Sequence, residues 1–198
     1  EGPKRRLQYI CLGSSDERFQ ALQARIEAEK KIVGPPAEIP GDGIWCLDPD
    51  GICLNIVVAT PADSLGGPET TAPGEPPAIN TPGRFNRIGQ RAAPPRGREN
   101  RPRRLGHILQ FTPDLKKKVW FYTEVLGFLL ADRVGDALAF LYCEGGSDHH
   151  VMALAASQAP GLHHLSFELG DVDEVGQLGM QMLEKGHRDG WGFGRHVI

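Results

Sequence analysis

Two histidines occupy equivalent positions in two strand-like runs of this 198-residue chain. His107 lies in LGHILQFT (105–112), and His164 lies in LHHLSFEL (162–169). For a single histidine, an ordinary hydrogen-bonded strand residue is the commoner case, but the repeat favours a shared role. Neutral imidazole is a ligand for iron, zinc, copper or nickel, and two histidines plus one carboxylate leave open positions on non-haem iron. We therefore predict a metal site that contains His107 and His164.

Strand alternation selects His164 over its neighbour His163. Successive side chains of a strand point to opposite faces, so His164 shares a face with Ser166 and Glu168. His163 shares the other, apolar face with Leu165, Phe167 and Leu169. In the first run, the face of His107 also carries Leu105, Leu109 and Phe111. If the two runs pair as related repeats, His107 and His164 converge within a half-barrel.

The elements around the histidines repeat along the chain, which is the strongest signal of the fold. After 105–112 the sequence predicts a helix at 114–126 and strands near 128–134, 137–142 and 149–155. After 162–169 it predicts a helix at 171–185. Before both runs it predicts a strand at 7–13, a helix at 16–31 that Ser14 or Ser15 caps, and strands at 44–48 and 52–59. The turn Asp48-Pro49-Asp50-Gly51 makes a hairpin of the last two strands.

A linker is predicted at 61–102, because that stretch holds nine of the 16 prolines and six glycines without apolar periodicity. It separates a partial N-terminal domain, 1–60, from a partial C-terminal domain, 103–198. Eight arginines lie at its basic end and just beyond it, against the single acid Glu99: Arg84, Arg87, Arg91, Arg96, Arg98, Arg101, Arg103 and Arg104. A nucleic-acid arm is the alternative interpretation, but a single aromatic residue, Phe85, is interleaved for stacking.

The composition is that of an ordinary globular protein, with 40% hydrophobic and 24% charged residues and a net charge of −3. This balance gives no bias towards nucleic acid or membranes, and no apolar run approaches the roughly 20 residues of a membrane span. No apolar segment of a signal peptide follows the charged N-terminus. None of the four cysteines forms a CxxC pair. We expect Cys11, Cys46 and Cys53 to be buried, reduced thiols of a cytoplasmic protein.

Four longer stretches resemble the type I extradiol dioxygenases of the vicinal oxygen chelate (glyoxalase/bleomycin resistance/dioxygenase) superfamily: LGHILQFTPDLKKKVWFYTEVLGFLLADRVGD, DHHVMAL, PGLHHLSFELGDVDEVG and GFGRHVI. The resemblance is strong over 103–198, and 7–60 is similar to the second module of the family's non-catalytic N-terminal domain. It implies an α+β fold of repeated βαβββ modules that form open half-barrels in two domains, both incomplete at the ends of this chain.

The resemblance also implies roles for individual residues. His107 and His164 match the two histidine ligands of the metal. His150, 14 residues before His164, matches an acid-base group beside bound O2. His196 of GRH matches a catalytic histidine that binds the catechol oxygens. Tyr142 matches an aromatic wall of the substrate pocket, although ordinary strand packing explains it equally well.

The implied activity is cleavage of a catechol by O2 at Fe(II), with Mn(II) as a known variation, in a protein that usually forms homo-oligomers. Nucleic acid and membranes are not expected partners. The family's third ligand is a glutamate in a strand after GRH, and the sequence ends at Ile198 before such a strand. Glu168 is a poor substitute, because four strand residues separate it from His164 by about 13 Å. We therefore expect this chain alone to bind iron poorly.

Two alternatives remain open at this point. One is a metal-free, drug-sequestering module of the same fold, and the other is a differently metallated, glyoxalase-like enzyme. Asn55 shows how the first could arise, since it stands where the metal-binding version of its strand carries glutamate.

Overall fold

The computed structural model describes residues 7–37, 39, 41–59, 80–89, 102–190 and 192–195. Within these ranges the chain is α+β, as predicted. The elements are β1 (Tyr9–Ser14), α1 (Asp16–Ala28), β2 (Ile44–Leu47), β3 (Cys53–Val58), β4 (Arg104–Thr112), α2 (Leu115–Trp120), the π-helical turn η2 (Phe121–Val125), β5 (Phe128–Val134), β6 (Leu138–Cys143), β7 (Met152–Ala156), β8 (Gly161–Glu168) and α3 (Val172–Glu184). None of the described helices is long and apolar enough to cross a membrane.

The chain divides into two compact units that do not follow its linear order. One comprises Glu1–Leu65 and Leu105–Ser166, and the other comprises Gly66–Arg104 and Phe167–Ile198. A single apolar core in the first unit draws on both of its segments, from Ile10 and Leu54 to Phe121 and Leu154. The predicted domain boundaries at 60 and 103 stay a prediction, because most of the linker lies outside the described residues.

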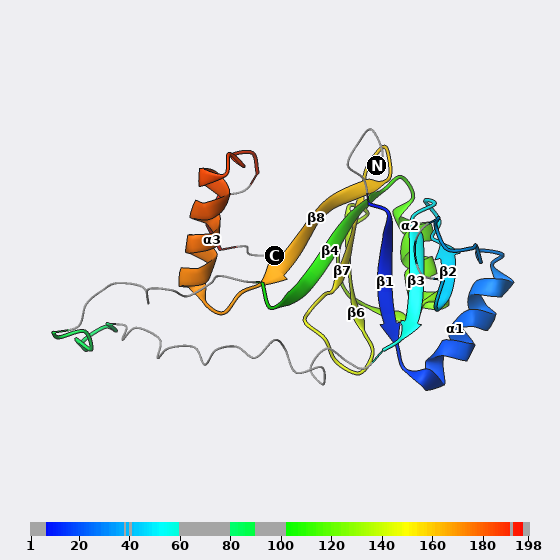
Figure 1. Ribbon diagram of the computed structural model, residues 1–198, viewed down its shortest axis with the longest axis horizontal. Coiled ribbons are helices and arrows are strands. Elements are labelled where there is room, and N and C mark those ends of the chain that lie inside the picture. The colour runs from blue at the N-terminus through cyan, green and yellow to red at the C-terminus, as the bar shows by residue number, and fades with distance from the viewer. Residues whose placement is uncertain are drawn as a thin grey trace. The chain divides into compact units, whose positions relative to one another are not determined.

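The first sheet has the strand order β1-β3-β2 (Figure 1). β1 pairs with β3 in parallel, and β2 pairs with β3 in antiparallel orientation. The hairpin predicted around Gly51 is confirmed, with Gly51 at φ 80°. Asp48 fixes this turn, because its Oδ1 accepts hydrogen bonds of 2.9 Å from the backbone nitrogens of Asp50 and Ile52.

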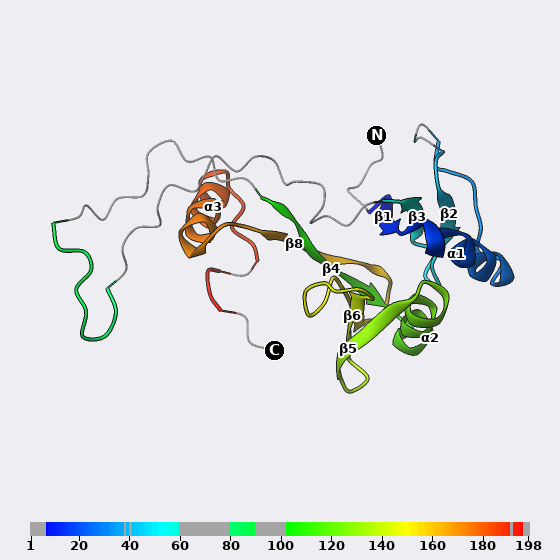
Figure 2. The ribbon, with the colours of Figure 1, turned by 90° about the horizontal axis from the view of Figure 1, so that it is seen from below.

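The second sheet has the order β5-β6-β7-β4-β8, so the two histidine-bearing strands, β4 and β8, are neighbours (Figure 1; β5 is labelled in Figure 2). β4, α2, β5, β6 and β7 make one complete βαβββ module, as the repeat predicted. β4 pairs with β7 in parallel, with Ile108 opposite Met152 and Leu109 opposite Ala153. β8 lies at the edge of the sheet beside β4.

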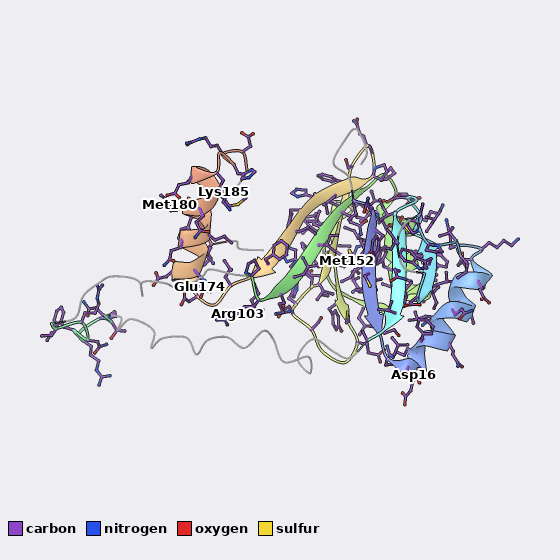
Figure 3. All side chains as sticks on the ribbon, viewed as in Figure 1. Asp16, Arg103, Met152, Glu174, Met180 and Lys185 are labelled. Carbon is purple, nitrogen blue, oxygen red and sulfur yellow. The ribbon has the colours of Figure 1, made fainter. Side chains whose placement is uncertain are left out.

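The register divides this sheet into two faces. Ile108, Leu141 and Met152 lie side by side and belong to the apolar core, to which α2 contributes Leu115. Figure 3 labels Met152, and Figure 2 shows α2 at the edge of this part of the molecule. Side chains of the odd-numbered positions of β4, which include His107, therefore point to the opposite face. The helix supports β4 from one side and leaves the other side open for the histidines.

The helix predicted at 114–126 changes type after Trp120. Residues 121–125 form a π-helical turn, in which the Leu126 nitrogen donates to the Phe121 carbonyl at 3.1 Å. The Thr123 hydroxyl donates to the Val119 carbonyl at 3.1 Å, a side-chain bond that competes with the helical pattern. The turn directs Phe121 and Tyr122 into the core.

A buried ion cluster joins the β2–β3 turn to α2. Lys118 Nζ lies 3.0 Å from Asp48 Oδ2 and 2.8 Å from Asp50 Oδ2, and the exposed fractions of these side chains are 0%, 0% and 5%. Lys118 also donates to Gln110 Oε1 at 3.0 Å. The predicted turn therefore does more than reverse the chain: its two acids neutralise a buried lysine.

Two smaller expectations need correction. Ser15 occupies the N-cap of α1, but neither it nor Ser14 makes a side-chain cap hydrogen bond, whereas Asp114 and Asp171 cap α2 and α3. The four cysteines are free, as predicted, but Cys46 alone is buried; Cys53 is half-buried and Cys11 is exposed. Cys11 is exposed because burial alternates along β1, where its neighbour Ile10 faces the core.

Candidate metal centre

His107 and His164 meet across neighbouring strands, as predicted. Their Nε2 atoms lie 2.9 Å apart and their rings are at 74°, in an edge-to-face arrangement. Both residues are half-buried. Because β4 and β8 are adjacent in the sheet, their backbones fix this approach.

The pair is suited to a divalent metal. Two imidazole nitrogens at this separation can both lie about 2.1 Å from one ion, the distance usual for imidazole on zinc. They would supply two of the three protein ligands in a site of two histidines and one carboxylate. Within the described part of the chain, no group of three or more His, Cys, Asp or Glu side chains is arranged to hold a metal.

His150 belongs to the same cluster. Its ring centroid lies 4.6 Å from that of His107 and 4.9 Å from that of Phe140. Phe140 is 2% exposed, so His150 has an apolar wall on one side and the histidine pair on the other. The structure thus brings together three of the four histidines assigned from the sequence.

Tyr142 lies near this cluster on β6. It is half-buried and follows Phe140 by two strand positions, which puts both side chains on the face of β6 that His150 contacts. This placement is compatible with an aromatic wall, but the role of Tyr142 stays a prediction. His196, the predicted catechol-binding histidine, lies outside the described residues.

Burial along β8 alternates as strand geometry requires, with His164, Ser166 and Glu168 more protected than His163, Leu165 and Phe167. The apolar set is nonetheless the exposed one: Leu165 is 43% and Phe167 51% exposed. On β8, at the edge of the sheet, apolar composition therefore does not indicate burial.

Sequence reasoning gave His163 no function, but the residue contacts the cluster. Its Nδ1 lies 2.8 Å from His164 Nδ1, and its ring centroid lies 4.8 Å from that of Phe111. The adjacent pair of histidines in GLHH was the one available signal. His149 and His150 repeat the contact, with their Nδ1 atoms 3.1 Å apart.

Asn55 is part of the β1-β3-β2 sheet, in a buried position. Its Nδ2 donates to the Asp42 carbonyl at 2.9 Å, and the Cys11 thiol lies 3.6 Å from its Oδ1. The side chain at this position bridges a loop to the strand.

Comparison with known proteins identifies relatives of the chain. Residues 104–198 match the family model "Glyoxalase/Bleomycin resistance protein/Dioxygenase superfamily". Metapyrocatechase 2 from Cupriavidus necator is 37% identical over 203 residues, which cover 100% of this chain and 59% of the relative. The chain therefore spans less than two thirds of that relative.

Solved structures share the fold. The 2,2',3-trihydroxybiphenyl 1,2-dioxygenase from Sphingomonas wittichii strain RW1 superposes with a TM-score of 0.60 at 25% identity, over 94% of this chain and 61% of its own. The Mn(II)-bound glyoxalase from Novosphingobium aromaticivorans gives a TM-score of 0.63 at 24% identity, over 93% and 53%. At 24% identity, the similarity to the Novosphingobium glyoxalase concerns the fold alone.

Proposed function

We propose that the protein is an extradiol dioxygenase, because residues 104–198 match the model of the Glyoxalase/Bleomycin resistance protein/Dioxygenase superfamily. It would cleave a catechol-type ring beside the diol and place both atoms of O2 in the product, so that no external reductant is needed. The observation that carries the proposal is the histidine cluster. The Nε2 atoms of His107 and His164 face each other at 2.9 Å, and the ring of His150 packs against that of His107.

His107 and His164 would hold the metal through the lone pairs of their Nε2 atoms, because these are the nitrogens that face each other. When bound, the metal gives the diol and O2 a common coordination sphere and a path for electrons between them. We propose Fe(II), with Mn(II) as the alternative. Two half-buried imidazoles on neighbouring strands would define two ligand positions before the metal binds.

His150 would act as the acid-base group. Imidazole exchanges a proton near neutral pH, and a positioned general acid or base contributes typically 10²–10⁴-fold to a rate. Its Nδ1 faces His149, so we assign the proton transfer to Nε2. Phe140 packs against one side of the His150 ring, with the ring centroids 4.9 Å apart. We also propose substrate contacts from Tyr142 and His196.

The remaining parts of the proposal concern the setting of the protein. Free thiols at all four cysteines fit a cytoplasmic protein. A homo-oligomer that binds a catechol and O2, rather than nucleic acid or a membrane, is the assembly we propose.

The test uses the natural full-length protein, reconstituted with Fe(II) under anaerobic conditions. Catechol and O2 are then added, and oxygen uptake is measured beside the absorbance of the yellow ring-opened product. One O2 consumed for each ring opened supports the proposal. Metal binding without ring cleavage across a panel of catechols would favour a glyoxalase-like enzyme, and binding of neither metal nor O2 would favour a sequestering module.

A further inference from the structure

The chain has two His-His dipeptides near His107. In each, the ring of the second histidine lies next to His107, and the first histidine contacts the second. His164 and His150 lie near His107, at ring-centroid distances of 5.1 Å and 4.6 Å. Their preceding neighbours, His163 and His149, approach them through Nδ1 at 2.8 Å and 3.1 Å. The two dipeptides therefore share one arrangement, in which an outer histidine holds Nδ1 of an inner one.

The 2.8 Å contact requires one proton between the two Nδ1 atoms, because one nitrogen must donate and the other must accept. His164 can hold a metal through Nε2 only when that atom carries a lone pair. The neutral His164 ring then carries its proton on Nδ1 and donates it to His163. His163 accepts through its Nδ1 lone pair and keeps its own proton on Nε2.

The His163 ring is itself held in place. It packs against Phe111 with ring centroids 4.8 Å apart and an interplanar angle of 50°. Phe111 belongs to β4, the strand that carries His107. The acceptor for His164 is thus positioned by the same strand that supplies the other ligand.

We propose that His163 is a positioning residue for the metal centre, which sets the tautomer and the ring orientation of His164. This inference rests on the proposed function, since it takes His164 as a ligand. Outer hydrogen-bond partners of metal-bound histidines usually fix the tautomer, and their loss costs about 10–100-fold in metal affinity or activity.

The first test measures Zn(II) affinity of the full-length protein by competition with a chromophoric chelator. His163→Phe keeps a ring against Phe111 but removes the acceptor, and we expect it to weaken Zn(II) binding about tenfold or more. His163→Asn restores an acceptor and should recover most of the affinity. His149→Phe is the matched control, because it alters the other dipeptide, and it should leave Zn(II) affinity unchanged.

His164→Ala distinguishes the two levels of the proposal. Wild-type affinity in His163→Phe, together with lost affinity in His164→Ala, would overturn the positioning role and leave the metal site standing. Wild-type affinity in His164→Ala would instead overturn the metal site itself.

A second measurement does not depend on the stability of any variant. Long-range ¹H–¹⁵N NMR of the Zn(II)-loaded wild-type protein reports which nitrogen of each histidine carries the proton. We expect the proton of His163 on Nε2 and that of His164 on Nδ1. A His163 ring that is protonated on Nδ1 would contradict the proposal, because it would donate to His164 rather than accept from it.

Discussion

Lys118 Nζ lies 2.8 Å from Asp50 Oδ2, in an ion pair whose side chains are 0% and 5% exposed. Asp48 supplies a second carboxylate at 3.0 Å. The acids come from the turn between β2 and β3, and the lysine comes from the helix that supports the histidine-bearing sheet. The pair therefore ties the segment before the predicted linker to the segment after it.

Replacement of Lys118 by methionine should destabilise the protein strongly. The substitution leaves two carboxylates buried without their cation, and removal of one partner from a buried pair costs about 3–5 kcal/mol. The free energy of unfolding, measured by urea denaturation, reports the loss. Lys117→Met is the matched control: Lys117 is exposed at the preceding position of the same helix, and surface changes usually stay within about 0.5 kcal/mol. Equal stability of the two variants would show that the buried pair contributes nothing.

Loss of either proposed ligand histidine should abolish iron binding. We expect His107→Ala and His164→Ala in the full-length protein to contain no iron after anaerobic reconstitution, because each removes one of two facing Nε2 atoms. Elemental analysis by mass spectrometry measures the iron content. His187→Ala is the control, since His187 is exposed and follows α3. Normal iron in either cluster variant would refute the ligand assignment.

His150 should matter for turnover and not for metal content. Phenylalanine at this position keeps a ring against Phe140 and His107 but cannot exchange a proton. We expect His150→Phe to bind iron normally and to lose about 10²-fold or more in kcat, the typical contribution of a general acid or base. Steady-state oxygen uptake, normalised to bound iron, measures kcat. Turnover at the wild-type rate would remove His150 from the mechanism.

The sequence could predict the histidine pair because both signals are local. The repeat located the two strands, and alternation along β8 distinguished His164 from His163 without knowledge of the partner strand. The burial pattern of β8 agrees with that choice. The contact between His163 and Phe111 could not be predicted, since it depends on how two strands approach in space.

The buried ion pair shows where such reasoning fails. The sequence has three consecutive lysines in α2, and nothing in their order shows that Lys118 turns inwards while Lys116 and Lys117 stay exposed. Lys118 is the buried lysine because its Nζ pairs with Asp50, which lies 68 residues earlier in the chain. The exposure of Leu165 and Phe167 has a related explanation, because composition does not reveal which face of a strand remains uncovered.

Stability should fall at alkaline pH through Cys46. Burial, and secondarily Cys53 and Asp48, raises the pKa of the Cys46 thiol to about 12. The unfolded chain loses this proton near the ordinary thiol pKa of 9.0, so the native state binds more protons between that pH and about 12. The contribution of the protonated Cys46 thiol to the free energy of unfolding is fully present below the unfolded pKa of 9.0. It decreases as pH rises from 9.0 towards about 12, by at most about 1.4 kcal/mol per pH unit.

The comparison of wild type with Cys46→Ala isolates this thiol from other groups that titrate in the same range. Unfolding by urea at neutral and alkaline pH should show a smaller alkaline loss in Cys46→Ala. An equal loss in both proteins would mean that Cys46 does not control it.

Gly43 should tolerate alanine far less well than Gly51, although both have positive φ angles, of 87° and 80°. An L-residue in the left-handed region costs about 1–2 kcal/mol, and this cost is common to both positions. A Cβ on Gly43 would lie 2.3 Å from the Ile56 carbonyl oxygen, which belongs to the β3 backbone, whereas a Cβ on Gly51 meets no atom within 4 Å. Because a strand backbone cannot give way as a flexible side chain can, Gly43→Ala should lose about 1–3 kcal/mol more than Gly51→Ala, as for other overpacked sites. Urea denaturation of the two variants makes the comparison, and equal losses would show that the loop before β2 moves aside.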